Sequence, residues 1–270
     1  MKNKIRIAFI GCGNMARAIM TSMNNVSVRA AFKSNREELR IVASDCDEGK
    51  TLVIRGLCNV AKDNASAASE ADYVILCVKP QDVEKAVEGV DLSQKTVISI
   101  MAGVTLETLE KLTKSTRIVR VMPNINASVG ESLNAYCAKG LDGETLRVVL
   151  SILGSFGVCV EVEEDKMSAV TALSGSGPAF VFSAMKAFYD EAVARGFDEQ
   201  TAKQIAVQTV IGSVLLAEKS EAGFDKLISS VCSKGGTTEA GVKCLKDNGF
   251  EDILCHAIDA AARKAEEMKK

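Results

Sequence analysis

The sequence predicts a doubly wound, mainly parallel α/β domain, followed by a domain made only of helices. Three observations carry this prediction. Short β-branched runs alternate with helix-period segments through the first 163 residues. A glycine-rich turn directly follows the first run, and beyond residue 165 no run has the pattern of a strand. The chain has 270 residues, which is close to two domains of about 150 residues each.

The expected strands of the first domain are short apolar runs. Because they show little polar alternation, they suit strands buried on both faces of a parallel sheet. These runs are Lys4–Ile10, Leu39–Ser44, Tyr73–Val78, Thr96–Ile100, Arg117–Met122, Leu133–Ala138 and Val158–Val162.

Segments between several of these runs have the apolar spacing of helices. Pro80 suits the first turn of its helix, where a backbone N–H is not needed. The expected helices of the first domain are Asn14–Asn24, Pro80–Glu88, Thr105–Lys114 and Gly143–Leu153.

The character of the chain changes after the acidic stretch 161–165, and we place the domains at 1–164 and 165–270. Gly196 is a natural helix stop, and Asp198 is a natural N-cap for the helix after it. The helices expected in the second domain are Met167–Leu173, Pro178–Arg195, Glu199–Lys219, Phe224–Cys232, Thr238–Lys246 and Asp252–Met268.

Composition excludes several classes of protein. Lys and Arg number 33 and Asp and Glu 35, a net charge of −2, so the basic excess of a nucleic-acid-binding protein is missing. Aromatic residues make up 4% and Trp is absent, which disfavours base-stacking surfaces. The longest apolar stretch, 205–217, is too short to span a bilayer. The N-terminal segment lacks a clear signal-peptide cleavage site.

The sequence has nine cysteines and one histidine, which limit the metal sites and disulfides that it could form. The closest cysteines, Cys244 and Cys255, are 11 residues apart, so no short metal-binding spacing occurs. An odd number of cysteines, mostly in apolar runs, indicates buried thiols in a reducing cytosol. His256 alone excludes a site with two histidine ligands. We therefore expect a cytoplasmic protein with no bound metal, no membrane segment and no nucleic-acid partner.

The first chemical motif is Gly11-Cys12-Gly13-Asn14-Met15-Ala16, which follows an apolar run and opens a helix. This is the G-x-G-x-x-G/A pattern of dinucleotide-binding domains. Its glycines permit a tight turn and close backbone approach, and the helix start offers unpaired N–H groups to a pyrophosphate. The alternative is an ordinary strand–helix turn, but the position of the motif favours dinucleotide binding.

Asp45 lies where the second strand should end, close to the expected adenosine ribose. A carboxylate there can bond the ribose hydroxyls, which favours NAD over a 2′-phosphorylated cofactor. Alternatively, Asp45 caps a helix around Glu48. The sequence leaves both interpretations open.

The segments Cys77–Pro80 and Ile100–Gly103 follow two other strands. Ligands of open α/β sheets lie outside the carboxyl ends of the strands, so both segments are candidates to line the cofactor site, although either could be an ordinary loop.

Two turns rich in Gly, Ser and Thr, at 173–179 and 233–238, lie in the helical half. Each should precede a helix and present N–H groups and hydroxyls at its positive end, a suitable cradle for a carboxylate. Ser176 belongs to the first turn. The alternative for each turn is simple helix capping.

Taken together, these segments resemble pyrroline-5-carboxylate reductases nearly end to end. The resemblance implies a Rossmann domain, a helical dimerisation domain, an active site at the dimer interface of a homodimer or larger homo-oligomer, and NADPH or NADH as hydride donor. The segments that carry it are Gly11–Ala16, Val78–Pro80, Ala102–Thr105, Arg120–Asn124, Leu173–Ala179 and Gly235–Thr238.

The resemblance also implies site residues. Thr238 would be catalytic, with Glu164, Ser176, Gly236, Thr237 and Thr238 binding the substrate, 1-pyrroline-5-carboxylate. The cofactor residues expected from the motif and the resemblance are Ile10, Gly11, Cys12, Gly13, Asn14, Met15, Ser44, Asp45, Asn64, Cys77, Val78, Lys79, Pro80, Ile100, Met101 and Ala102.

Two positions depart from the family. Asp45 replaces a Ser near the 2′-phosphate, which puts NADPH preference in doubt, and Ser230 replaces an Asn, which affects a minor cofactor contact.

A protonated cyclic imine already attracts hydride, so such an enzyme needs positioning and a hydrogen-bonding group more than a strong acid. Two rival interpretations share the fold. A β-hydroxyacid dehydrogenase should carry Lys and then Asn one turn later, but Lys186 is followed there by Tyr189. A non-catalytic dinucleotide-binding regulator would be favoured by loss of Thr238 or of the Gly-Gly turn, and both are present.

Overall fold

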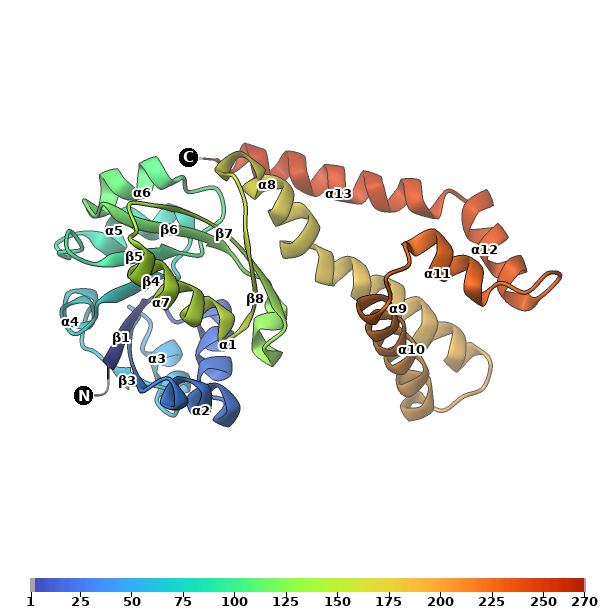
Figure 1. Cartoon of the computed structure of the whole chain (residues 1–270), viewed down its shortest axis with the longest axis horizontal. Helices are drawn as coiled ribbons and strands as arrows, with labels where there is room; N and C mark the ends of the chain where they lie inside the picture. The colour runs from blue at the N-terminus through green and yellow to red at the C-terminus, as the bar shows by residue number, and fades with distance from the viewer. Residues whose placement is uncertain (1–2, 270) are drawn as a thin grey trace. The chain divides into compact units, whose positions relative to one another are not determined.

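The computed structural model describes residues 3–269, which form two compact units (Figure 1). One unit runs up to Ser176 and includes the segment from Ala261 on, and the other is Gly177–Ala260. The domain boundary expected between residues 164 and 165 stays a prediction.

The first unit is built on an eight-stranded sheet in the order β3-β2-β1-β4-β5-β6-β7-β8. Its pairs are parallel except β6 with β7, which is antiparallel. The predicted doubly wound, mainly parallel sheet is therefore confirmed. The strands are β1 (Asn3–Ile10), β2 (Glu37–Ser44), β3 (Asn59–Val60), β4 (Tyr73–Leu76), β5 (Thr96–Ser99), β6 (Arg117–Met122), β7 (Ser132–Lys139) and β8 (Gly157–Glu161).

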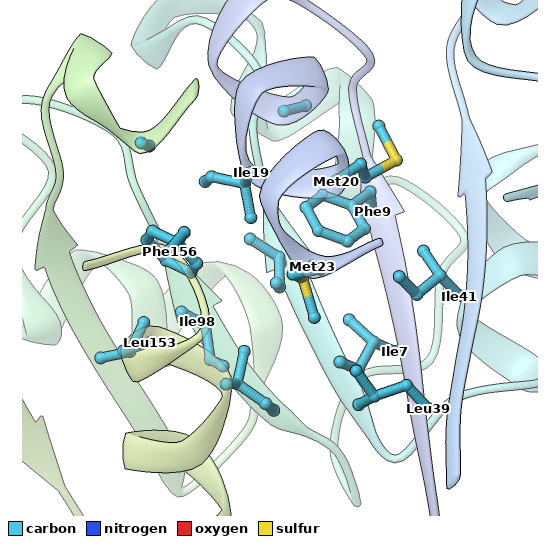
Figure 2. Packing of buried hydrophobic residues seen from close by; sticks show 14 of the residues in the cluster. Ile7, Phe9, Ile19, Met20, Met23, Leu39, Ile41, Ile98, Leu153 and Phe156 are labelled. Atoms are coloured by element: carbon cyan, nitrogen blue, oxygen red, sulfur yellow. The ribbon is translucent and has the colours of Figure 1, made fainter. Parts of the chain in front are cut away.

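Helices cover both faces of this sheet, and each face has its own core. On one face Phe9 and Ile41 of the strands pack with Ile19 and Met23 of α1 and Leu153 of α7 (Figure 2). On the other face, apolar residues of α4, α5 and α6 cover β1, β4 and β5. The helices are α1 (Asn14–Met23), α2 (Val26–Ser34), α3 (Glu48–Ile54), α4 (Asn64–Ser69), α5 (Val83–Val87), α6 (Leu106–Thr113), α7 (Gly143–Gly154) and α8 (Met167–Val170).

Several short elements differ from the sequence predictions. The helices α2 and α4 and the strand β3 were not expected. The helix predicted at Pro80–Glu88 is divided into a 3₁₀ turn, Pro80–Asp82, and α5, although Pro80 does occupy the first turn as predicted. Three strands end earlier than predicted, β4 at Leu76, β5 at Ser99 and β8 at Glu161.

The prediction of a turn at 173–179 is wrong for residues 173–175, which are helical. Thr171–Gly175 is a π-helical turn that continues α8, and Ser176 N–H donates to Thr171 O at 2.9 Å. Gly177 then begins α9. The Gly-Ser-Gly pattern resembles a loop, but here one extra residue is absorbed within helical structure.

The second unit contains only helices among its described residues, as predicted. Gly196 ends α9 as predicted, with a φ of +90°. Asp198 is the predicted N-cap of α10, because its side chain accepts from Thr201 N–H. Its helices are α9 (Gly177–Ala194), α10 (Glu199–Lys219), α11 (Phe224–Val231), α12 (Thr237–Asp247) and most of α13 (Phe250–Glu267).

Many large apolar side chains of this helical unit are exposed, which is unusual for a surface that faces water alone. They include Phe182, Phe188, Ile211, Val214, Leu215, Leu216, Phe224, Ile228, Val231 and Ile253. Between α9 and α10 lies an apolar cavity of about 630 Å³, lined by residues such as Phe182, Met185 and Tyr189. Across residues 3–269, no helix has the length and apolar character needed to cross a bilayer.

Candidate functional site

The glycine-rich loop lies at the carboxyl edge of the sheet, beside the ends of two neighbouring strands. Gly11 N–H donates to Ser44 O at 2.9 Å, beyond the pairing of β1 with β2. On the other side, Cys77 N–H donates to Ile10 O at 2.8 Å. In the same way Ile100 N–H donates to Leu76 O. The predicted cofactor segments after β1, β2, β4 and β5 therefore share one edge.

Glycine occupies positions 11 and 13 of the loop for two different structural reasons. Gly11 has a φ of +96°, and a Cβ there would lie 2.9 Å from the carbonyl carbon and oxygen of Cys77. Gly13 has ordinary φ and ψ as the N-cap of α1, and a Cβ there would meet nothing within 4 Å. Gly11 is thus required by the fold, whereas Gly13 leaves open space in front of the helix.

The start of α1 at Asn14 offers backbone N–H groups that no side chain caps. No side chain caps this ten-residue helix, and its first turn contains no acidic residue. Free N–H groups at a helix start attract an anion such as a pyrophosphate. The loop therefore fits the phosphates of a dinucleotide.

Asp45 is held inside the loop region and does not cap the next helix. Its Oδ2 accepts from Cys12 N–H at 2.7 Å, and its Oδ1 accepts from Asp47 N–H at 2.9 Å. The capping interpretation of Asp45 is wrong, because Asp47 caps α3 by accepting from Gly49 and Lys50 N–H. The side chain of Asp45 is only 8% exposed.

Lys50 is a charge near this position that sequence reasoning missed. Its Nζ lies 3.8 Å from Asp45 Oδ1 and 3.8 Å from Asp47 Oδ2, and its side chain is 49% exposed. If Asp47 had been identified as the N-cap of α3, Lys50 would have been placed in the first turn of that helix, close to Asp45.

Ser44 and Asn64, both predicted cofactor residues, bond each other. Ser44 Oγ donates to Asn64 Oδ1 at 2.7 Å, and Asn64 Nδ2 donates to Ala86 O at 2.9 Å. These bonds fix the Asn64 amide at the start of α4, next to the end of β2.

The segments after β4 and β5 are loops with different environments. Val78 is half-buried, and Lys79 is exposed directly before the 3₁₀ turn that starts at Pro80. Met101 is buried, and its N–H donates to Ser99 Oγ at 3.3 Å. Beyond Ala102, the backbone of Gly103 packs so closely on Met268 that a Cβ would collide with the Met268 carbonyl.

Glu164 begins a 3₁₀ turn three residues beyond the end of β8, the last strand. Its Oε1 accepts from Leu106 N–H at 2.7 Å and from Arg120 Nη1 at 3.1 Å. The alternative that Glu164 is a solvated charge in an acidic linker is therefore wrong. Arg120, which sequence reasoning did not single out for the site, is buried beneath it.

In the helical unit, Gly236 is the N-cap of α12, so Thr237 and Thr238 are its first two residues. A Cβ on Gly236 would collide with Ser233, and Gly235 N–H donates to Glu239 Oε2 at 2.7 Å. No side chain caps this helix. Capping therefore does not explain the two threonines, whose hydroxyls make no hydrogen bond to any described residue.

Burial raises the pKa of the Cys12 thiol to about 12, with a smaller contribution from the Asp45 carboxylate. At neutral pH this thiol stays protonated, and its Sγ donates to Ser44 O at 3.4 Å. Within the described residues, no three His, Cys, Asp or Glu side chains are grouped to hold a metal ion.

The open, mainly parallel sheet with its glycine-rich loop defines a dinucleotide-binding fold. Two family models agree: one for F420-dependent NADP oxidoreductases matches residues 6–103, and one for pyrroline-5-carboxylate reductase dimerisation matches residues 164–268. Two curated relatives, from Methanosarcina acetivorans and Aquifex aeolicus, are named pyrroline-5-carboxylate reductase. The first is 37% identical and the match covers 100% of both chains; the second is 35% identical over 98% of this chain and 97% of its own.

Solved structures give the same result. The Plasmodium falciparum pyrroline carboxylate reductase with NADP bound has a TM-score of 0.87, with 28% identity and full coverage of both chains. The Coxiella burnetii pyrroline-5-carboxylate reductase has a TM-score of 0.85 and 32% identity, covering 99% of this chain and 100% of its own. The chain therefore belongs to the pyrroline-5-carboxylate reductase family, whose members are NAD(P)H-dependent oxidoreductases.

Proposed function

We propose that this chain reduces the C=N bond of 1-pyrroline-5-carboxylate with NADPH or NADH and releases L-proline, the last step of proline biosynthesis. The observation that carries the proposal is the start of α12. There Thr237 and Thr238 lie on an uncapped helix with hydroxyls that bond no described residue. Such a start can hold a carboxylate and a ring nitrogen at once.

The cofactor would be held at the carboxyl edge of the sheet. Its pyrophosphate fits the open loop at Gly13 and the uncapped start of α1. Asp45, Asn64 and the segments after β4 and β5 would contact the remaining parts. When bound, the reduced nicotinamide supplies a hydride.

The protein groups would position the substrate for this transfer. The backbone of 236–238 would bind the substrate carboxylate, and the Thr238 hydroxyl would bond the ring nitrogen. The protonated imine carries positive charge at that nitrogen, and the charge disappears as the ring carbon receives hydride. A bond that strengthens as the nitrogen becomes an amine stabilises the transition state more than the substrate. Glu164 and Ser176 are the other residues that we propose to bind the substrate.

We also propose a homodimer or larger homo-oligomer that works in the cytoplasm. The exposed apolar side chains of α9 to α11 support an interface between copies of this chain. All nine cysteines are free thiols, which suits a reducing compartment. The prediction that they are buried is wrong for most of them: only Cys12 and Cys137 are buried, four are half-buried, and Cys46, Cys244 and Cys255 are exposed.

Steady-state oxidation of NADPH and NADH with 1-pyrroline-5-carboxylate tests the function, with 3-hydroxy acids and NAD(P)⁺ as the comparison. We expect turnover only with the cyclic imine. Turnover of a 3-hydroxy acid would favour a β-hydroxyacid dehydrogenase, and cofactor binding without any turnover would favour a regulatory protein.

A further inference from the structure

Arg120 is an unusual residue of the core. It lies on β6 with 1% of its surface exposed, and it is the largest of the fully buried side chains in the described chain. Its Nη1 donates to Glu164 Oε1 at 3.1 Å, while its buried Nε has no partner among residues 3–269. Burying a guanidinium with an unpaired donor costs stability. An apolar residue would serve the core better, so stability alone does not explain Arg120.

The carboxylate that pairs with Arg120 joins three elements. Glu164 belongs to the 3₁₀ turn after the last strand, and its Oε1 also accepts from Leu106 N–H, the first residue of α6. Arg120 belongs to β6, next to β5 in the sheet. One oxygen atom therefore connects β6, the start of α6 and the segment that carries Glu164.

The geometry leaves the other carboxylate oxygen free. Glu164 Oε2 makes no hydrogen bond to a described residue, and the Glu164 side chain is 35% exposed. Glu164 is thus fixed at Oε1 and accessible at Oε2, an arrangement suited to accept a bond from a ligand.

The pair of Arg120 and Glu164 also holds the end of the loop between β5 and α6. This loop includes Met101 and Ala102, and it ends at Leu106, whose N–H is held by Glu164. Without Arg120, the carboxylate could turn toward water, and Leu106 N–H would lose its partner.

We propose that Arg120 is a positioning residue for the reductase reaction: it fixes Glu164 through Oε1, so that Oε2 faces the substrate and the start of α6 stays in place. This rests on the proposed function for the role of the substrate, but the anchoring of Glu164 can be tested without turnover.

The test compares Arg120→Met, which removes the guanidinium, with Arg120→Lys, which keeps a cation and a donor. The matched control is Glu37→Gln, which alters another pair with one buried partner, Glu37 with Arg147 at 3.0 Å. That pair lies at the start of β2, at the opposite edge of the sheet from the glycine-rich loop. Two readouts are needed: kcat and KM for 1-pyrroline-5-carboxylate and for NADPH, and amide hydrogen exchange at Leu106.

We expect Arg120→Met to lower kcat/KM for the imine about tenfold or more, the effect of losing a charge-assisted hydrogen bond. KM for NADPH should change less than KM for the imine, because neither Arg120 nor Glu164 is itself a predicted cofactor residue. Leu106 should exchange faster, and Arg120→Lys should restore part of both readouts. Glu37→Gln should change the melting temperature alone.

Wild-type kinetics and Leu106 exchange in Arg120→Met would overturn the proposal. If that variant fails to fold, the same result in Arg120→Gln, which also removes the cation, would overturn it. So would equal losses in Glu37→Gln, because Arg120 would then act only through stability. A wild-type protein that does not reduce the imine would refute the proposed function and the substrate role of Glu164. Leu106 exchange would still decide whether Arg120 holds Glu164.

Discussion

The carboxylate of Asp45 is bonded to the glycine-rich loop itself, with its Oδ2 2.7 Å from the backbone nitrogen of Cys12. The end of β2 and the loop after β1 are therefore hydrogen-bonded to each other, and Lys50 lies 3.8 Å from the same carboxylate. We expect cofactor preference to depend on this small group of charges, because a 2′-phosphate would meet both the carboxylate and the ammonium.

We expect Asp45→Ser to raise kcat/KM for NADPH relative to NADH by about tenfold or more, since ~1.4 kcal/mol of removed repulsion corresponds to tenfold. Kinetics with both cofactors measure the ratio. Asp72→Ser is a suitable control because Asp72 precedes β4, at the opposite edge of the sheet. If the wild type already prefers NADPH strongly, Lys50 outweighs the carboxylate. A ratio that does not move would show that Asp45 only supports the loop.

The two glycines of the loop should respond differently to alanine. Gly11→Ala places a Cβ against the Cys77 carbonyl at a positive φ, so both the melting temperature and cofactor affinity should fall. Gly13→Ala meets open space, so stability should stay close to wild type while cofactor affinity falls, because the methyl group occupies the place of the phosphates. Thermal unfolding and cofactor titration separate the two effects. Unchanged cofactor affinity in Gly13→Ala would place the pyrophosphate elsewhere.

Thr238→Ala should lower kcat/KM for 1-pyrroline-5-carboxylate. The expected loss of transition-state stabilisation is about 1–3 kcal/mol, the usual cost of a lost buried hydrogen bond. Cofactor affinity should be nearly unchanged. Thr238→Ser keeps a hydroxyl and should retain most of the activity. Full activity in Thr238→Ala would remove this residue from the catalytic group.

Cys137 should contribute to a loss of stability in alkali. Burial, followed by the nearby Glu164 carboxylate, raises the pKa of this thiol from 9.0 to about 11. Above pH 9 the unfolded chain therefore loses this proton before the folded chain does, so the free energy of unfolding falls as pH rises toward 11. Urea unfolding at several pH values should show a smaller decrease in Cys137→Ala than in the wild type. Equal slopes would mean that the thiol ionises freely in the folded protein.

The sequence was sufficient for the parts of the fold that depend on local patterns. Buried parallel strands are continuous apolar runs, and the Gly11–Ala16 motif is informative because a strand precedes it and a helix follows. The helix α4 could not be found in this way, since only Ala67 and Ala68 of its six residues are buried. Its apolar periodicity is too weak to detect.

The details of the site depended on tertiary contacts that no spacing reveals. Asp45 and Asp47 are equally good caps by composition, and the end of β2 decides which of them reaches the α3 backbone. The bond between Ser44 and Asn64 spans 20 residues, and that between Arg120 and Glu164 spans 44. The roles of the cofactor and substrate residues remain predictions.

The most direct test of the central claim follows the hydride into the product. The protein is incubated with 1-pyrroline-5-carboxylate and a reduced cofactor that carries deuterium at the transferred C4 position, with a chelator present, and proline is analysed by mass spectrometry and NMR. We predict L-proline with one deuterium on the ring carbon that was double-bonded to nitrogen. Absence of proline, or proline without deuterium at that carbon, would contradict hydride transfer to the imine by this protein.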